Sequence, residues 1–407
     1  MRVLILTQYY PPEIGAPQTR LAALARELRR RDHEVEVVTA MPHHLVGRTY
    51  KGYRGKFYMR DMVDGTTVHR TWVYAATGTG IRRIANYLSF TCTSLVGLAL
   101  AQRPDVIFVE SPPLFLSVPG WIAATLRKAK LIFNVADLWP DSVRELGVMQ
   151  DGPMLRAAER LEAWTYRKAD IVNAVTNGIE ETLRSRKGVP AAKLRFLPNG
   201  IDVDSFSPRP PLQSLARSLR LDERRIFIYA GTHGIAQGLE HVVDAAKLVE
   251  DRAIVLFVGS GPTKHALLER ARRAGITNIR FVDPVPLDRM PAYFSLAYAS
   301  IVPLVRSELM RGARPSKLFP ALASGVPIVY SGEGEGAQLV ADAQAGVVVP
   351  PENPTALANA MRELCDDVAT RNEMAERARA LAVDRFAWST IVGSWLQTIE
   401  RKEFTAV

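Results

Sequence analysis

The sequence predicts an α/β protein with two doubly wound domains that face each other across a cleft. Its 407 residues exceed the roughly 250–300 at which a single hydrophobic core stops growing. Short runs rich in Val and Ile alternate with helical stretches in both halves, which is typical of mainly parallel sheets covered by helices. Between the halves, the segment LPNGIDVDSFSPRPP at 197–211 concentrates Pro, Asn, Gly, Asp and Ser, which favours a hinge.

The first half begins with a strand and a helix. In the helical stretch TRLAALARELRRR at 19–31, four apolar residues share one face, and the three final arginines suit the negative end of a helix. The apolar residues are Leu21, Leu24, Ala25 and Leu28. Strands are expected at 2–7, 34–39, 67–73, 105–110, 130–135 and 170–175.

The second half repeats the alternation. Strands are expected at 225–231, 253–259, 278–283, 299–304, 326–332 and 345–350. Helices are expected from about 238 and 263, near 291, and over most of 355–383. In a pair of such domains, ligands are expected in the crevice outside the carboxyl ends of the strands.

The charge of the chain is unevenly distributed. Residues 1–200 hold 28 Lys and Arg against 18 Asp and Glu, whereas residues 201–407 hold 24 of each, so the net charge of +10 lies in the first half. Such a half suits an anionic bilayer or a phosphorylated substrate. Nucleic acid is disfavoured as a partner, because the basic residues are scattered and no nucleic-acid-binding motif is present.

The cysteine content and the start of the chain favour a cytoplasmic protein. Cys92 and Cys365 lie far apart in the sequence and form neither a disulfide framework nor a metal knuckle, so we expect two buried thiols in a reducing compartment. The opening MRVLILTQYYPPE is too short in its apolar run for a signal peptide and is typical of a buried strand.

The uncharged segment between Arg83 and Arg103 is a candidate for contact with a membrane. No charged residue occurs between Arg83 and Arg103, but several Ser, Thr and Asn residues make the stretch too polar for a confident membrane span. A helix over about 84–101 is expected. It is either packed in the core or, with Tyr87, Phe90 and the preceding arginines, placed at a membrane surface.

Three glycine turns follow predicted strands. They contain Gly15 in TQYYPPEIGAP, Gly231 in YAGTHGIAQG and Gly259 in FVGSGPTK. A turn of this kind at a helix start exposes backbone N–H groups that suit a phosphate. The dinucleotide pattern G-x-G-x-x-G is absent, and each turn alone is equally consistent with an ordinary strand-to-helix connection.

The segment PLVRSELMRGARPSK at 303–317 is rich in cations. They lead into a helix for which Ser316 is a plausible N-cap. Fixed cations beside a helix start can neutralise a diphosphate leaving group without a metal; the alternative is a solvated loop. The cations are Arg306, Arg311, Arg314 and Lys317.

Carboxylates follow two predicted strands of the first half. Asp137 and Asp141 occur in NVADLWPDS, and Glu110 occurs in VESPP. A carboxylate at a strand end can orient an acceptor hydroxyl or a sugar, so Asp137 is a catalytic candidate and the other two are candidates for the acceptor side. Each is also explained as a helix cap.

No metal or other cofactor is expected. The histidines at 43, 44 and 233 lack ligand spacing with Cys, Asp or Glu, and no D-x-D pair ends a strand.

In this order, the segments PPEIGAP, ADIVNAVTNGIEETL, LPNGIDVDSF, GTHGIAQGLEHVVDAA, FVGSGP and ASGVPIV resemble the retaining glycosyltransferases of family 4, which have the GT-B fold. ESPPLF, DLWPDS and PSK resemble the fucosaminyltransferase-like and colanic-acid-type branch of surface polysaccharide assembly. The resemblance implies metal-independent transfer of a sugar from a nucleotide-diphosphate donor, with a UDP-sugar favoured, to a lipid-linked or other glycan acceptor. It also implies a cytoplasmic enzyme peripheral to the inner face of the plasma membrane.

The resemblance assigns roles to the domains. Residues 1–198 with a returning C-terminal helix at 386–407 would bind the acceptor, and residues 199–385 would bind the nucleotide-sugar. The loop at Gly15 and Ala16 would approach the donor phosphates, with the nucleotide over Gly231. Gly259 and Ser316 complete the expected donor contacts.

The sequence departs from the family pattern at two places. Thr232 and Gln237 replace an Arg and a Lys, so we assign the neutralising role to Arg306, Arg314 and Lys317. Gly312 and Pro320 replace the paired glutamates, so the ribose must be held by another group; Glu308, Glu333 and Glu335 are weak substitutes.

The proline also bears on local structure and on function. If Ser316 caps the helix, Pro320 removes its first N–H bond, so we expect a helix that starts nearer Phe319 or a distorted first turn.

Two alternatives to a transferase remain open: a nucleotide-sugar 2-epimerase or hydrolase, and a silent partner of a glycosyltransferase complex.

Overall fold

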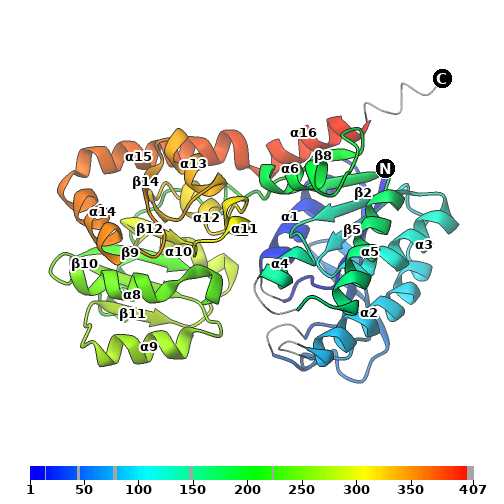
Figure 1. The fold of residues 1–407 in the computed structure, drawn as a ribbon, viewed down its shortest axis with the longest axis horizontal. Helices are drawn as coiled ribbons and strands as arrows, with labels where there is room; N and C mark the ends of the chain where they lie inside the picture. The colour runs from blue at the N-terminus through cyan, green and yellow to red at the C-terminus, as the bar shows by residue number, and fades with distance from the viewer. Residues whose placement is uncertain (14, 44–45, 77–79, 146–149, 222–223, 401–407) are drawn as a thin grey trace. The chain divides into compact units, whose positions relative to one another are not determined.

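The computed structural model describes residues 1–13, 15–43, 46–76, 80–145, 150–221 and 224–400. The chain forms two compact units, each with its own sheet (Figure 1). The first unit consists of Met1–Asn199 and the C-terminal segment from Ile391, and the second of Gly200–Thr390. Both sheets are doubly wound and covered by helices, so the predicted fold class is confirmed.

The first unit contains an eight-stranded sheet in the order β3-β4-β2-β1-β5-β6-β7-β8. All neighbours are parallel except β3 and β4, which form an antiparallel hairpin through Asp64 and Gly65, both with positive φ, as this two-residue turn requires. The strands are β1 Arg2–Leu6, β2 Glu34–Ala40, β3 Tyr58–Val63, β4 Thr66–Thr71, β5 Val106–Ser111, β6 Lys130–Val135, β7 Ile171–Ala174 and β8 Leu194–Phe196. The six predicted strands are present, and β3 and β8 were missed.

Helices cover both faces of this sheet. The predicted apolar face of α1 is fully buried, which confirms the helical periodicity. Helices α2, α3 and α5 pack beside one another against the strands (Figure 1). The helices are α1 Ala16–Arg30, α2 Ile81–Leu100, α3 Ser117–Arg127, α4 Asp141–Glu145, α5 Pro153–Lys168 and α6 Asn177–Ser185, with the short η1 Leu114–Leu116 before α3.

The second unit contains a six-stranded parallel sheet in the order β11-β10-β9-β12-β13-β14. All six predicted strands are present: β9 Arg225–Ala230, β10 Ala253–Val258, β11 Ile279–Val282, β12 Ala299–Pro303, β13 Ile328–Ser331 and β14 Gly346–Val349. Its core joins β9 and β10 to α8 and α14.

The predicted helices of the second unit are present and begin close to the expected positions. The helices of this unit are α7 Gln213–Ser218, α8 Leu239–Leu248, α9 Lys264–Arg273, α10 Met290–Phe294, α11 Glu308–Arg311, α12 Leu318–Ala323, α13 Glu335–Asp342, α14 Pro354–Asp366 and α15 Val368–Leu381. Of these, α7, α11 and α13 were not predicted. Three short helical segments are η2 Ile235–Gln237, η3 Leu287–Arg289 and η4 Ala382–Phe386.

The helix α16, Trp388–Glu400, carries the chain back to the first unit. Trp395 is buried with its ring edge-on to Phe108 of β5, at 6.0 Å between centroids. Its indole Nε1 donates a hydrogen bond to the side-chain oxygen of Asn173 of β7 at 3.1 Å. The last described helix therefore completes the core of a unit whose strands lie some two hundred residues earlier.

The structure corrects the expectation of two buried thiols. Cys92 is exposed on α2, and Cys365 is half-buried on α14. The cause is visible on α2, where Phe90 and Leu98 are buried while Leu88 and Leu95 are exposed; Cys92 belongs to the exposed side. Across the described ranges, every helix is too short or too polar to cross a membrane.

The contribution of α16 can be measured by shortening Trp395. We expect Trp395→Ala to lower the free energy of unfolding of the first unit by about 3–5 kcal/mol, because a buried aromatic ring is removed. Trp395→Phe should cost about 1–3 kcal/mol, since the ring is kept but Asn173 loses its donor. Urea unfolding followed by circular dichroism measures both. Equal costs for the two variants would contradict the packing role given to the ring, because both variants lose the hydrogen bond and only one loses the ring.

Candidate active site

Two glycine turns pack backbone against backbone at the carboxyl ends of β9 and β10. The amide of Gly231 donates to the carbonyl of Val258, and that of His233 to Ser260, both at 2.9 Å. A Cβ at Gly259, where φ is +142°, would overlap the carbonyl of Gly231. Gly259 therefore cannot be replaced without moving the turns, which lie at the carboxyl ends of the strands, where ligands bind in this kind of sheet.

His233 lies beneath these turns in an aromatic box. Its ring is fully buried, and neither ring nitrogen has a hydrogen-bond partner among the described residues. Burial, together with the ammonium groups of Lys264 and Lys317, lowers the pKa of His233 to about 4. The imidazole is therefore neutral near pH 7. The surrounding rings are those of Tyr229, Phe257 and Phe281.

Lys317 reaches the first of the two turns. A Cβ at Gly231 would lie 2.6 Å from Lys317 Cε, and the Lys317 ammonium is 5.7 Å from the ring centroid of Tyr229. Within the part of the chain that the structure describes, no carboxylate pairs with this ammonium. Burial lowers the pKa of Lys317 to about 8. Lys317 is thus a cation held against a glycine turn without a counter-charge.

The neighbouring lysine is bound differently. Lys264, the first residue of α9, donates to the carbonyl of Gly259 at 3.0 Å and to Asp283 at 2.6 Å. Its ammonium therefore supports the second turn and is already neutralised. Sequence reasoning missed it, because its role depends on Asp283, nineteen residues away.

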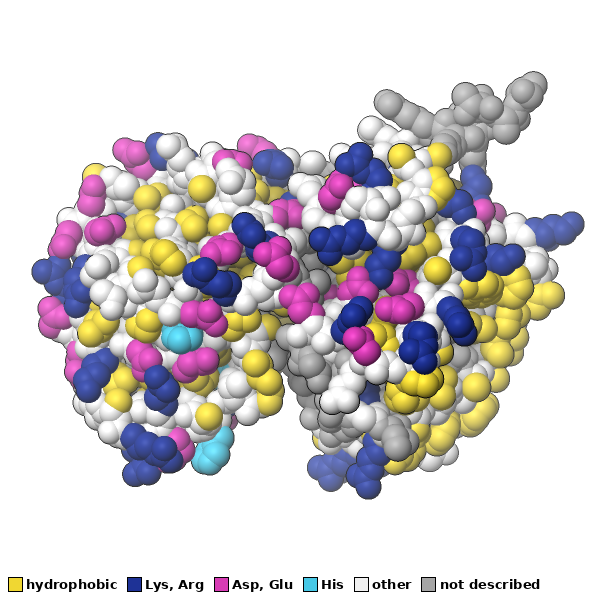
Figure 2. Space-filling model, in the orientation of Figure 1, with side chains coloured by type: hydrophobic (Ala, Val, Ile, Leu, Met, Phe, Trp, Pro, Cys, Tyr) yellow, Lys and Arg dark blue, Asp and Glu magenta, His cyan; other side chains and the backbone are white. Residues whose placement is uncertain are grey.

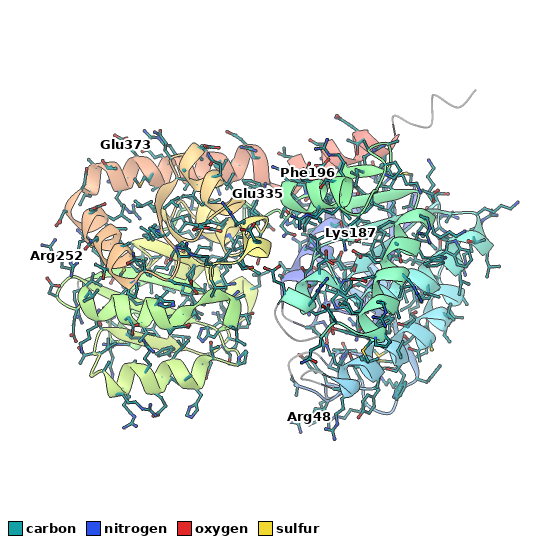
Figure 3. All side chains as sticks on the ribbon, in the orientation of Figure 1. Arg48, Lys187, Phe196, Arg252, Glu335 and Glu373 are labelled. Carbon is teal, nitrogen blue, oxygen red and sulfur yellow. The ribbon has the colours of Figure 1, made fainter. Side chains whose placement is uncertain are left out.

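The three arginines of the basic segment are all paired with carboxylates. Arg314 is buried and bonded to Glu335 at the start of α13 (Figure 3). Arg306 lies 3.7 Å from Glu333, and Arg311 lies 3.2 Å from Glu308. The structure therefore separates Lys317 from the other three cations of the segment. The three glutamates considered for the ribose all engage arginines.

The start of α12 corrects one local prediction. The N-cap position is Lys317 rather than Ser316, which is exposed, and no side chain caps the helix. The helix begins at Leu318, one residue before the expected start near Phe319. Pro320 is its third residue, where the backbone N–H would have no helical acceptor, so the proline removes no helical hydrogen bond. Its carbonyl accepts normally from Ser324.

The remaining predicted donor contacts lie on the same turn or on the first unit. Thr232 is exposed, and its carbonyl accepts from the Tyr229 hydroxyl. The side-chain oxygen of Gln237 accepts from the amide of Gly234 at 3.1 Å. In the first unit, a side chain at Gly15 would displace the amide of Gln18, which folds back over the start of α1.

Glu110 is enclosed at the end of β5. It is buried, pairs with Arg20 of α1, and accepts from the side-chain amide of Asn134 at 2.9 Å. Arg20 also donates to Asn199 at 2.9 Å. Glu110 therefore holds α1 and the end of the first unit together. Sequence reasoning missed Arg20, because nothing in its own segment separates it from the other arginines of α1.

The two aspartates after β6 have different surroundings. Asp137 accepts from the Ser142 hydroxyl at 2.9 Å, and burial raises the pKa of its carboxyl. Asp141 accepts from Lys187 at 2.8 Å, and Lys187 also pairs with Glu162 (Figure 3). Asp141 is therefore neutralised in place, whereas Asp137 has only a hydroxyl as its side-chain partner among the described residues.

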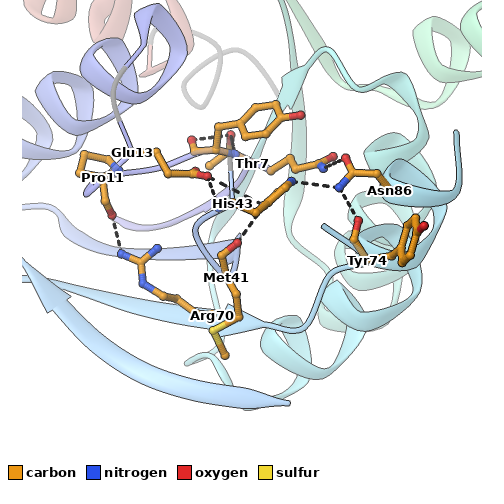
Figure 4. Close-up of polar contacts among 10 residues, drawn as sticks. Thr7, Pro11, Glu13, Met41, His43, Arg70, Tyr74 and Asn86 are labelled. Atoms are coloured by element: carbon orange, nitrogen blue, oxygen red, sulfur yellow. Dashed lines mark hydrogen bonds and ion pairs between the residues drawn. The ribbon is translucent and has the colours of Figure 1, made fainter. Parts of the chain in front are cut away.

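The structure also describes His43, one of the three histidines considered as metal ligands. Its Nδ1 bonds to the carbonyl of Met41 at 2.9 Å, and its Nε2 accepts from Asn86 at 3.0 Å (Figure 4). His44 lies outside the described residues. No group of three or more potential metal-binding side chains occurs in the described ranges.

Comparison with known protein families places both units. The model of the glycosyl transferase 4-like domain matches residues 15–200, and that of the glycosyl transferases group 1 matches residues 224–367. The chain is a glycosyltransferase of the GT-B fold. Its first unit is of the family 4 type, as the sequence motifs predicted.

Relatives and solved structures agree with this assignment. The putative colanic acid biosynthesis glycosyl transferase WcaI of Escherichia coli is 27% identical over 89% of this chain and 92% of its own length. A GDP-mannose-dependent phosphatidylinositol monomannoside mannosyltransferase of Mycobacterium tuberculosis is 23% identical over 84% and 91%. HepE of Anabaena in complex with UDP-glucose has a TM-score of 0.74, 17% identity, and coverage of 98% of this chain and 100% of its own.

The contact between the glycine turns can be tested by adding one methyl group. We expect Gly259→Ala to cost about 1–3 kcal/mol of unfolding free energy beyond its backbone strain, because the turns must separate. Gly275→Ala is the matched control, since Gly275 also has positive φ but faces open space. Chemical denaturation of the two variants gives the difference. A Gly259→Ala cost no larger than that of the control would contradict the packing.

Proposed function

We propose that this glycosyltransferase moves a sugar, with retention of configuration and without a metal, from a UDP-sugar to a lipid-linked glycan in surface polysaccharide assembly. The observation that carries the donor part is Lys317, a cation without a carboxylate partner among the described residues, held against the glycine turn at Gly231. The UDP-glucose bound by HepE and the name of the Escherichia coli relative support the donor class and the pathway class.

The diphosphate of the donor is proposed to lie at the paired turns. One partly desolvated ammonium, already held in place, stabilises negative charge as the leaving group forms. Lys317 provides the ammonium, and Gly231 and Gly259 allow close approach of the backbone. Arg306 and Arg314 are proposed to contribute less than Lys317, because both are paired with glutamates, and Thr232, Gln237 and Ser316 border the nucleotide.

The chemical step needs no covalent enzyme nucleophile. The bond between the anomeric carbon and the diphosphate oxygen breaks, and the acceptor oxygen bonds to the same face of the carbon. The acceptor proton passes to the departing diphosphate. Asp137 accepts a hydrogen bond from the acceptor and orients it. Glu110 and Asp141 support the acceptor side through their ion pairs, and Gly15 offers backbone N–H groups at the start of α1.

The acceptor is proposed to be reached at the cytoplasmic face of an anionic membrane. Exposed leucines occur on α2 and α3, and Figure 2 shows hydrophobic side chains gathered over these helices. The net positive charge of the chain lies in residues 1–200. A partly buried apolar surface with basic residues binds anionic interfaces without spanning them. The leucines are Leu88, Leu95, Leu100 and Leu126.

The donor assignment predicts a loss of transfer when Lys317 is removed. We expect Lys317→Ala to reduce transfer from UDP-sugars by about 100-fold, as expected for one preorganised charge donor. UDP affinity should fall by up to about tenfold per pH unit above pH 8, because the ammonium loses its proton there. Radiolabelled transfer to a polyprenyl-diphosphate glycan extract and UDP-induced shifts in Tm measure the two effects.

Lys317→Arg is the control, because it keeps its charge above pH 8 and should bind UDP with little pH dependence. Transfer by Lys317→Ala at the unaltered rate would overturn the diphosphate assignment. Absence of both transfer and a UDP-induced shift in the unaltered protein would support a silent partner. Sugar release without an acceptor would support an epimerase or hydrolase.

The membrane assignment predicts a loss of vesicle binding on adding charge to α2 and α3. We expect Leu95→Glu/Leu126→Glu to reduce cosedimentation with phosphatidylglycerol vesicles at least about fivefold, since two exposed apolar contacts become anionic. Leu248→Glu/Leu268→Glu, at two exposed leucines of the second unit, is the control. Equal binding by the two double variants would contradict the assignment.

A further inference from the structure

We propose that the loop at 46–57 of the first unit, hereafter the basic loop, forms a binding site for the phosphate or diphosphate group of a lipid-linked acceptor. The inference rests on the proposed function for the source of the ligand. The site itself is independent of the glycine turns and of Lys317.

The basic loop encloses a pocket of 320 Å³. Small-molecule sites have volumes of roughly 300–1,000 Å³, so the pocket suits a compact group. Three cations and two aromatic rings line it above Met41, namely Arg48, Arg54, Lys56, Tyr53 and Trp72. Arg48 lies at the outer edge of the first unit (Figure 3). Arginine and lysine side chains bind phosphate oxygens, and the two rings can contact an apolar group next to the phosphate.

The charge of the basic loop is not compensated. Four cations and no carboxylate occur in the basic loop. Among the described residues no carboxylate forms an ion pair with any of the four, whereas each arginine of the 303–317 segment has a carboxylate partner. Like charges held close together repel unless an anion neutralises them. An unneutralised cluster around a pocket therefore favours an anionic ligand.

Backbone contacts hold the basic loop in place. The amide of Gly47 donates to His43 at 3.1 Å, and that of Tyr50 donates to Pro42 at 2.8 Å. Glycines 47, 52 and 55 all have positive φ, which permits the reversals of the chain. Arg54 Nε donates to the carbonyl of Thr49 at 2.9 Å. A loop ordered before binding loses less conformational entropy when the ligand arrives.

A buried polar network fixes the base of the loop (Figure 4). Glu13 accepts from the backbone amide of His43 at 2.7 Å, and the His43 ring is bonded at both nitrogens. Arg70 is fully buried, pairs with Asp61 at 2.9 Å, and stacks its guanidinium 5.3 Å from the ring centroid of Tyr53. The pocket is thus built on the carboxyl ends of β2 and β4.

The segment that carries Trp72 of the pocket packs against α2. Thr93 of α2 donates to the carbonyl of Trp72 at 2.6 Å, and the amide of Tyr74 donates to Ser89 of α2 at 2.9 Å. Trp72 and Tyr74 are themselves exposed by 43% and 42%. Aromatic residues of this kind occupy membrane interfaces. A ligand with a phosphate head and a hydrocarbon tail fits this arrangement better than a free phosphate.

Trp72 allows a direct binding test on the full chain. We expect inorganic pyrophosphate and geranyl diphosphate to change the tryptophan fluorescence, with geranyl diphosphate binding at least tenfold more tightly. The change should vanish in Trp72→Phe and in Arg48→Gln/Arg54→Gln/Lys56→Gln. It should persist in Lys317→Ala and in Arg156→Gln/Arg160→Gln/Arg167→Gln, which removes three exposed cations from α5.

The outcomes separate the possible sources of the anion. Equal affinity for the two probes would overturn the lipid source and leave a free-phosphate site. A fluorescence change retained in the basic-loop triple variant would overturn the site itself. An unfolded triple variant would be recognised by its Tm, and the single variant Arg48→Gln, at an exposed residue, would then replace it with a smaller expected loss of about threefold.

A transfer assay connects the site to the reaction. In the basic-loop triple variant we expect the KM for a polyprenyl-diphosphate acceptor to rise at least tenfold, while the KM for the UDP-sugar and the UDP-induced Tm shift stay unchanged. An unchanged acceptor KM would overturn the proposal. Failure of the proposed function is a different result, because UDP would then shift the Tm of neither protein while the fluorescence change remained.

Discussion

The close contact between the turns after β9 and β10 constrains everything proposed for the second unit. Gly231 and Gly259 meet through their backbones, and the side chain of Lys317 packs against the first of the two turns. The first turn also contains His233, whose ring lies against that of Tyr229. A rigid strand end of this kind holds the Lys317 ammonium in place, so little reorganisation is needed when negative charge develops beside it.

Pairing with carboxylates then determines which cations are available to bind an anionic ligand. Sequence reasoning treated the arginines and the lysine of the 303–317 segment as one group, but Glu335 engages Arg314, and Glu333 and Glu308 engage the other two arginines. A cation already paired with a carboxylate contributes less to binding a new anion than one that is not. The basic loop of the first unit shows the opposite arrangement, with cations and no paired carboxylates among the described residues.

Most of the fold was accessible from sequence, because strands buried on both faces are continuous runs of Val, Ile and Leu. Strand β3 was missed because it is an edge strand with only partly buried residues. The start of α12 was misplaced because Ser316 has the right identity for a cap, whereas the N-cap position falls at Lys317 and no side chain caps the helix. Site partners were missed for a different reason: Arg20 with Glu110 and Lys187 with Glu162 meet only through the tertiary fold.

The return of α16 to the first unit has a consequence during synthesis. The strands of the first unit leave the ribosome long before Trp395, whose ring fills the space beside Phe108. At about 5–20 residues per second, nearly two hundred intervening residues delay completion of this core by about 10–40 s. Until then the surface awaiting the helix is exposed to chaperones and to neighbouring chains. Pauses or truncations in the synthesis of the second unit therefore leave the core of the first unit incomplete.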